Sequence, residues 1–394
     1  MATKQGERWI LLCTVGTSLK RTLEQWYAQM RGEKRSIAEF TEEDWSAAAN
    51  YIGKLDPSSR DCGAEINSIH DLIEAKDVIP APDIHLFHSD TDDGRNIARL
   101  LQRTYVHRGM REDRVQLQVI EDLRDSDPRA FRTKGLRNLV RQLCYCIRTF
   151  GPDACAINAT GGYKAQIAIA VMIGQALRVP VYYKHEFFTE HPIISFPPLP
   201  ITLDESVWRS NMTLFEELHE ADDFVPASRY DEELDEVLES LMEREWQEGE
   251  EFLMLSSAGQ ILHEKCKDGL PEEVEPLGEA KPKRPLIFSK DHGSEKQHLI
   301  RPFLEEVRDS NPFVITCRSW YFNPDLPQRN HFRMTRGQVT GVYSDGSFTS
   351  KFEVRTTAAD ENQKSLAVKR LNQWLEESTN QSRLDYLCVR GQIR

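Results

Sequence analysis

Two glycine-containing turns, each after a short apolar run, carry the groups best suited to binding an anion. The first is TVGTSL (Thr14–Leu19) and the second is NATGGYK (Asn158–Lys164). Each leads into an amphipathic run, so each offers backbone N–H groups and the positive end of a helix dipole. Neither turn is a GxGxxG or Walker A loop, so NAD and ATP are not the first expectation. On spacing alone, ordinary tight βα turns remain an equally good interpretation.

A third polar turn, HSDTDDG (His88–Gly94), follows another apolar run. Because the carboxyl ends of parallel strands face one crevice, we expect the three turns to lie near each other. The polar groups that they offer are the hydroxyls of Thr17, Ser18, Ser89, Thr91 and Thr160, the carboxylate of Asp90, the amide of Asn158 and the ammonium of Lys164.

The elements around these turns alternate between strand and helix patterns. Predicted strands are Trp9–Val15, Asp83–Ser89, Val115–Leu123, Ala154–Asn158 and Pro180–Phe187. Runs with apolar spacing of three and four separate them and predict helices. The pattern indicates an α/β, Rossmann-like domain with a parallel sheet covered on both faces, ending at a proline-rich stretch near residue 203.

Charge divides the rest of the 394-residue chain, whose net charge is −13. Residues 204–251 hold 18 acidic and three basic residues, a net −15, whereas 281–394 hold 19 basic and 13 acidic residues, a net +6. We predict domains at 1–203, 204–280 and 281–394. The middle one is expected to be helical, with Leu234, Val237, Leu238 and Leu241 on one face. A solvated spacer and a docking surface for a basic partner are both open interpretations.

Strand patterns in the C-terminal domain alternate between apolar and cationic residues and predict a small α+β fold. Arg333 alternates with Phe332 and Met334, and Lys351, Glu353 and Arg355 alternate with Phe352 and Val354. Arg318 and Trp320 share a face on a further strand. A cationic sheet face with an aromatic side chain suits a phosphate backbone with stacked bases, although a merely solvated face fits equally well.

Eight scattered cysteines without a CxxC pair indicate a reducing, cytoplasmic setting. The CxC spacing of Cys144 and Cys146 is more typical of buried thiols than of a metal site. The N-terminal sequence does not resemble a secretory signal, and no apolar run reaches the ~18 residues of a membrane span.

The paired motifs LCTVGTSL and INATGGYKAQIAIA, with HLFHSDTDDGRNIARLL between them, resemble the CARF domain, the CRISPR-associated Rossmann fold, over residues 8–200. The resemblance implies a homodimer that binds a cyclic oligoadenylate made by a type III CRISPR complex. We favour the tetra-adenylate and keep the hexa-adenylate as the alternative. By the family pattern, the ring would contact Gly16, Thr17, Ser18, Asn158, Thr160, Gly161, Gly162 and Lys164, and Ser89, Asp90 and Thr91 line the same crevice.

CARF domains are sensors, so the C-terminal domain is expected to be the output. The Arg-His spacing of HEPN ribonucleases occurs only at Arg178–His185, inside the predicted sensor. A metal-dependent PD-(D/E)xK nuclease would need Lys where Arg355 stands beside Glu353. Both are therefore disfavoured.

The basic sheet and closing helix of residues 283–394 resemble a RelE-type mRNA interferase. That resemblance implies a metal-independent endoribonuclease that needs no cofactor and cleaves mRNA on the ribosome. Its catalytic cations would be Arg318, Arg333, Arg336, Lys351 and Arg355. A basic ribosomal protein such as the stalk could dock on residues 204–251.

Two rival functions remain. A CARF-type transcription regulator could use MLSSAGQILHEKC (Met254–Cys266) as a DNA-recognition helix, although the acidic segment would repel DNA. A ring nuclease would degrade the cyclic oligoadenylate itself, but this leaves the basic C-terminal domain without a role.

Overall fold

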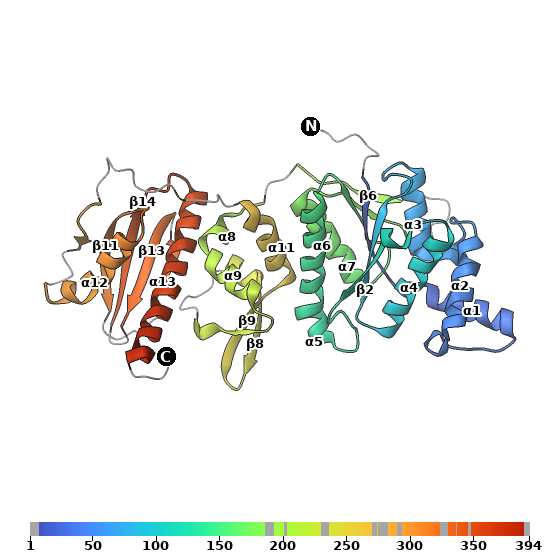
Figure 1. Cartoon of the computed structure of the whole chain (residues 1–394), viewed down its shortest axis with the longest axis horizontal. Helices are drawn as coiled ribbons and strands as arrows, with labels where there is room; N and C mark the ends of the chain where they lie inside the picture. The colour runs from blue at the N-terminus through green and yellow to red at the C-terminus, as the bar shows by residue number, and fades with distance from the viewer. Residues whose placement is uncertain are drawn as a thin grey trace. The chain divides into compact units, whose positions relative to one another are not determined.

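The chain divides into two compact units (Figure 1). Unit 1 comprises Met1–Leu203 and Ser256–Ile261, and unit 2 comprises Asp204–Leu255 and Leu262–Arg394. The computed structural model describes residues 8–185, 193–200, 203–229, 236–269, 274, 283–289, 294–323, 330–335, 337–345 and 348–389.

Unit 1 contains a six-stranded sheet in the order β3-β2-β1-β4-β5-β6. The first five strands in this order are parallel, and only β6 is antiparallel to its neighbour. This confirms the predicted α/β fold with a mostly parallel sheet. The strands are β1 (Ile10–Thr14), β2 (Asp83–Ser89), β3 (Val115–Ile120), β4 (Cys155–Asn158), β5 (Val181–Tyr183) and β6 (Ile194–Phe196).

Helices cover both faces of this sheet, as predicted. Leu11 and Cys13 of β1 face one apolar core, and Ile10 and Leu12 face the other, so all four side chains are buried. Helices α1 (Leu19–Arg31), α2 (Glu42–Lys54), α3 (Gly63–Glu74) and α4 (Asp92–His107) supply the first core, and α6 (Leu136–Phe150) and α7 (Lys164–Leu177) supply the second. Short segments η1 (Ile37–Glu39), η2 (Arg60–Cys62), η3 (Glu112–Arg114), α5 (Pro128–Ala130) and the π-helical η4 (Phe131–Gly135) connect them.

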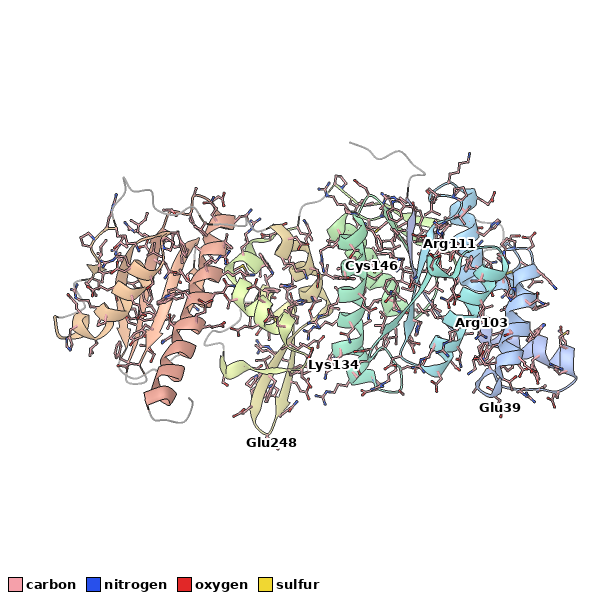
Figure 2. The ribbon with its side chains drawn as sticks, viewed as in Figure 1. Glu39, Arg103, Arg111, Lys134, Cys146 and Glu248 are labelled. Carbon is pink, nitrogen blue, oxygen red and sulfur yellow. The ribbon has the colours of Figure 1, made fainter. Side chains whose placement is uncertain are left out.

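The acidic part of unit 2 is not wholly helical, so that prediction is wrong. Residues Met242–Gln247 form strand β8, which pairs with β9 (Glu250–Leu255), and β9 pairs with β7 (Val225–Pro226). The β8–β9 turn, where Glu248 lies in Figure 2, has positive φ at Glu248 and Gly249, which suits a tight hairpin. The other elements are α8 (Ser206–Ser210), α9 (Met212–Glu220), η5 (Ala227–Arg229), α10 (Glu236–Ser240), α11 (Ser257–Cys266) and η6 (Lys267–Gly269).

The expected leucine stripe is also not a surface feature over the residues described. Leu238 is 4% exposed and packs in the core of this segment with Trp208 and Phe215. Leu241 packs against the same core, whereas Leu234 lies outside the described residues. Leu238 and Leu241 thus pack within unit 2, whereas Val237 of the predicted face is 55% exposed.

The C-terminal part of unit 2 forms a five-stranded sheet in the order β10-β11-β14-β13-β12. All neighbouring strands are antiparallel except β10 and β11. Helices α12 and α13 pack with the apolar side of the sheet, in a core that includes Phe332, Phe352 and Leu304. The elements are β10 (Ile287–Phe288), α12 (Ser294–Ser310), β11 (Val314–Asn323), β12 (His331–Thr335), β13 (Gln338–Ser344), β14 (Thr349–Thr356) and α13 (Glu361–Val389).

Two other expectations from the sequence concern the cysteines and membrane-spanning helices. Cys144 and Cys146, the latter marked on α6 in Figure 2, are buried thiols, in agreement with the interpretation preferred above. Among the described helices, none is both long and apolar enough to cross a bilayer.

We expect Gly341→Ala to destabilise unit 2 by about 1–3 kcal/mol, the usual cost of overpacking a core. A Cβ at Gly341 would lie 2.3 Å from Cζ of Phe352, a ring that is fully buried. Gly269→Ala is the matched control, because nothing lies within 4 Å of its added Cβ. Urea unfolding of the full chain measures both variants, and equal midpoints for the two would contradict the expectation.

Candidate functional site

The two predicted glycine turns meet at the centre of the sheet in unit 1. The chain runs from β1 to β2 on one side and later returns to β4 on the other side of β1. The β1–β4 crevice is therefore the topological switch point, where open α/β sheets bind ligands. A Cβ on Gly16 would lie 2.6 Å from the backbone nitrogen of Gly162, so the two turns touch through backbone alone.

Hydrogen bonds hold the second turn in place. The Thr14 hydroxyl donates to the carbonyl oxygen of Gly161 at 2.6 Å. Gly162 has φ of +92°, a conformation that favours glycine. The backbone N–H of Tyr163 donates to Oε1 of Gln166 at 2.6 Å. The turn is thus rigid before any ligand arrives.

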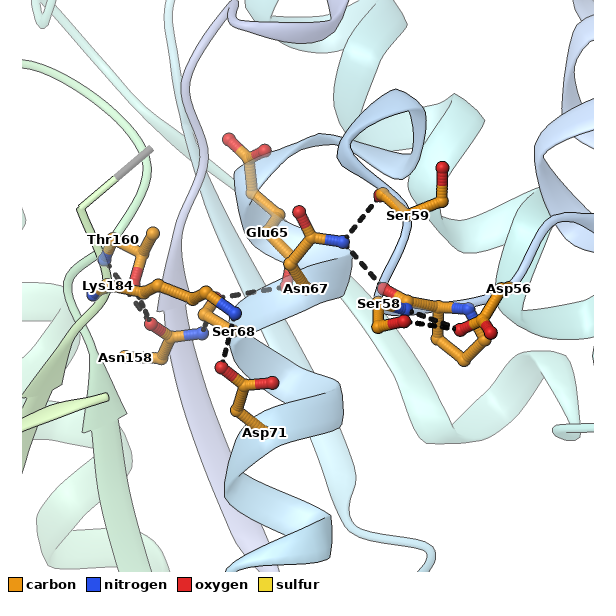
Figure 3. Close-up of polar contacts among 11 residues, drawn as sticks. Asp56, Ser58, Ser59, Glu65, Asn67, Ser68, Asp71, Asn158, Thr160 and Lys184 are labelled. Carbon is orange, nitrogen blue, oxygen red and sulfur yellow. Dashed lines mark hydrogen bonds and ion pairs between the residues drawn. The ribbon is translucent and has the colours of Figure 1, made fainter. Parts of the chain in front are cut away.

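Asn158 supports the turn through both ends of its amide (Figure 3). Its Oδ1 accepts from the hydroxyl of Thr160 at 2.6 Å and from the N–H of Thr160 at 3.3 Å. Its Nδ2 donates to the hydroxyl of Ser68 at 2.8 Å. Asn158 is 1% exposed, so the structure places this predicted ligand contact beneath the turn.

Four of the other predicted residues form the exposed rim of the crevice, whereas Gly161 is buried and Gly16 and Thr160 are half-buried. Thr17 and Ser18 precede α1, and Gly162 and Lys164 lie at the start of α7; all four are exposed. Lys184, which the sequence analysis did not single out, forms an ion pair with Asp71 nearby and donates its backbone N–H to the Thr160 hydroxyl at 3.0 Å (Figure 3). The rim combines two helix N-termini with a cation, an arrangement that suits phosphate groups.

The third predicted turn, after β2, is largely occupied with its own helix. The Ser89 and Thr91 hydroxyls are 2.8 Å apart, and Thr91 caps α4 by accepting from the N–H of Gly94 at 3.0 Å. The Asp90 carboxylate lies 3.5 Å from Arg124 and 3.8 Å from Arg95. Asp90 also lines a groove of about 570 Å³ with His88, Arg95, Arg99, Leu117, Val119, Glu121 and Asp122.

Sequence reasoning missed Glu65, a buried carboxylate on α3 that Figure 3 shows. It contacts both glycine turns. Its Oε1 accepts from the N–H of Gly16 at 2.8 Å, and its Oε2 lies 3.4 Å from the Ser18 hydroxyl. Burial raises the pKa of Glu65, and the hydrogen bonds only partly offset this effect. A single glutamate in a segment with no assigned element gave no signal that could have located it.

A second candidate site lies on the sheet face of unit 2 opposite the apolar core. Register places Arg318 of β11 opposite Glu353 of β14, Glu353 opposite Thr340 of β13, and Thr340 opposite Arg333 of β12. The predicted alternation is present, because Phe332, Phe352 and Val354 all belong to the core. We call Arg318, Arg333, Lys351, Glu353 and Arg355 together the cationic face.

Glu353 is the centre of the cationic face. Its Oε1 lies 3.1 Å from Nε of Arg355, and its side chain is 13% exposed. Ideal strand spacings give the distances from the Cα atom of Glu353. The Cα of Arg318 lies about 5 Å away, those of Lys351 and Arg355 about 7 Å, and that of Arg333 about 10 Å. Lys351 lies 5.6 Å from the ring centre of Tyr321, a residue that sequence analysis did not name. Arg336 lies outside the described residues.

No group of three or more metal-ligating side chains occurs within the part of the chain described. The cationic face itself offers four cations and one carboxylate. Such a set can bind a phosphodiester and offset charge that develops on it.

We expect Asn158→Ala to destabilise unit 1 by about 1–3 kcal/mol, because the buried Ser68 hydroxyl and the half-buried Thr160 would each lose a hydrogen bond. Asn138→Ala is the matched control, since Asn138 makes a single exposed bond to the Glu121 carbonyl. Thermal unfolding of the full-length variants measures the difference. An equal loss of stability in the Asn158→Ala and Asn138→Ala variants would show that Asn158 does not support the turn.

Comparison with known proteins adds one finding. Residues 60–199, about a third of the chain, match a family model described as CRISPR-associated protein (Cas_APE2256). No curated protein matches the chain. The matched range lies in unit 1 and includes Glu65 and the Gly161–Gly162 turn. The match supports a CRISPR-associated protein.

Proposed function

We propose that this protein is a metal-independent endoribonuclease of type III CRISPR antiviral defence, activated by a cyclic oligoadenylate. Unit 1 binds the ring, and the cationic face of unit 2 cleaves mRNA on the ribosome and so inhibits translation. The observation that carries the proposal is the grouping of four predicted cations around Glu353 on one sheet face. The CRISPR-associated match in unit 1 supports the sensing half.

The sensing half rests on the crevice between β1 and β4. A cyclic oligoadenylate presents a ring of phosphates, and the rim offers the N-termini of α1 and α7, the hydroxyls of Thr17 and Ser18, and Lys164. The symmetry of such a ring suits a homodimer with one crevice per subunit. Tetra-adenylate is our preferred activator, and hexa-adenylate is the alternative.

The catalytic half follows from the composition of the cationic face. The 2′-oxygen of the RNA attacks the adjacent phosphorus while Glu353 accepts the 2′-hydroxyl proton. The 5′-oxygen leaves and takes a proton from water, which gives a 2′,3′-cyclic phosphate and a 5′-hydroxyl. Arg318 and Lys351, close to Glu353, offset charge on the pentavalent phosphorus, an effect worth several kcal/mol when the donors are preorganised.

Individual positions on the face then have separate tasks. Arg355 orients the Glu353 carboxylate through their 3.1 Å contact. Arg333 lies two strands from Glu353, about 10 Å by strand spacing, so it suits a flanking phosphate. Tyr321 and Trp320 are 36% and 40% exposed on β11 and are available to stack with bases.

The rival DNA-binding regulator loses support from the structure of α11. Gln260 is fully buried, and His263 and Glu264 are each 2% exposed. A recognition helix needs an exposed face that can enter the major groove. Helix α11 instead contributes to the cores.

Ribosome docking through residues 204–251 needs a different apolar anchor from the buried Leu238. Trp246 on β8 is 69% exposed and lies on the acidic hairpin with Glu245, Glu248 and Glu250. A partly exposed aromatic among carboxylates suits a basic partner, such as a ribosomal stalk protein, with the charges steering the encounter.

In a ribosome translation reaction without added divalent metal beyond that required by ribosomes, we expect mRNA cuts only when cyclic tetra-adenylate or hexa-adenylate is present. Arg318→Ala should lower this cleavage about 100-fold or more, as removal of one preorganised donor does. Arg370→Ala, an exposed cation on α13, is the control. Mapping of the mRNA ends measures cleavage, and titration calorimetry measures ring binding. Tight ring binding without cuts would shift the assignment to a ring nuclease.

Trp246→Ala should weaken binding to purified ribosomes by about tenfold, since a buried aromatic anchor at an interface is worth roughly 1–2 kcal/mol or more. Tyr145→Ala, which removes a 66% exposed aromatic of unit 1, is the matched control. Co-sedimentation at several salt concentrations measures the loss. Unchanged binding of the Trp246 variant would exclude the hairpin as the docking element.

A further inference from the structure

Glu65 is an unexpected residue at a site built for anions. Its carboxylate is 1% exposed and accepts the Gly16 N–H, the kind of donor that an incoming phosphate would use. A Cβ on Gly161 would lie 2.5 Å from Oε1 of Glu65, so the carboxylate touches both turns. A buried carboxylate therefore lies at the base of the crevice.

No cation among the described residues forms an ion pair with the Glu65 carboxylate. Lys20 pairs with Asp93, and Lys184 pairs with Asp71. The titratable groups that face Glu65 are Cys13 of β1 and Tyr105 of α4; burial raises the pKa of both, so they stay neutral near pH 7. The adjoining turns contribute only neutral groups, apart from the exposed Lys164 at the rim.

Like charges at close range cannot both persist in a poorly solvated site. A phosphate at the rim would face the ionised Glu65 across the Gly16–Ser18 turn. Protonation of Glu65 at Oε2 removes the repulsion, and Oε1 still accepts the Gly16 N–H. The protonated Oε2 then donates to the Ser18 hydroxyl or to a phosphate oxygen.

We propose that Glu65 is a positioning residue that couples ring binding to the uptake of one proton per crevice. The inference rests on the proposed binding of a cyclic oligoadenylate at these turns. In the free protein, Glu65 is ionised and its carboxylate accepts the Gly16 N–H. In the ring-bound protein, Glu65 is neutral. Acidification thereby favours the ligand-bound state.

The sign of the pH effect follows from linkage. Burial already raises the pKa of Glu65, and a nearby phosphate raises it further. Between the free and the bound pKa, binding takes up a proton, so affinity falls as pH rises, by up to about tenfold per pH unit. Below the free pKa and above the bound pKa, affinity does not depend on this group.

Titration calorimetry with cyclic tetra-adenylate tests this, at pH 5.5 to 8.5 in buffers of different ionisation enthalpy, which count the protons taken up. The phosphodiesters and adenines of the ring do not titrate near neutral pH. We expect wild type to take up close to one proton per crevice. Glu65→Gln keeps an acceptor for the Gly16 N–H, so it should bind about tenfold or more tightly at pH 8 without proton uptake.

Glu74→Gln, at an exposed position on the same helix, is the matched control and should behave as wild type. Ring binding by wild type without proton uptake overturns the inference, whether or not the Glu65 variant folds. Equal pH profiles for wild type and Glu65→Gln also overturn it. Absence of ring binding by any protein at any pH overturns the proposed sensing function instead, and this inference with it.

Discussion

The close approach of two backbone turns is the constraint on which the unit 1 site depends. Gly16 and Gly162 touch with no space for a side chain, and the Thr14 hydroxyl reaches across to the carbonyl of Gly161. Because β1 and β4 are direct neighbours, this contact brings the N-termini of α1 and α7 to the same crevice. A larger distance between the turns would separate the N-termini of α1 and α7, which make the crevice suitable for phosphate.

The polar groups beneath the turns determine how the crevice responds to charge. Asn158 uses both ends of its amide on neighbours, so it stabilises shape and leaves the rim residues to meet a ligand. Glu65 has a different effect, since it brings a carboxylate to a place where N–H donors converge. The crevice thus combines a rigid backbone with one titratable group.

Unit 2 separates its apolar and cationic residues by the alternation of strands. Phe332, Phe352 and Val354 pack with α12 and α13, and the residues between them carry charge on the other face. The catalytic proposal depends on Glu353, which gathers Arg318 and Arg355 by register and by a direct contact.

Local patterns in the sequence determined the order of β1 to β5 and of helices α1, α4, α6 and α7 in unit 1, the positions of both glycine turns and the alternation on β12 and β14, but assigned no element to α2, α3 or β6. These features depend on residues that are close together in the chain, so the spacing of apolar and polar residues predicts them directly. The acidic segment was misread as one helix because Leu238 and Leu241 have helical spacing, but α10 ends at Ser240 and both leucines pack in the same core. Only tertiary structure decided that Glu65 lies at the turns, that Asn158 faces inward and that Arg318 lies opposite Glu353. Those contacts join segments distant in sequence or depend on register, so no local pattern could specify them.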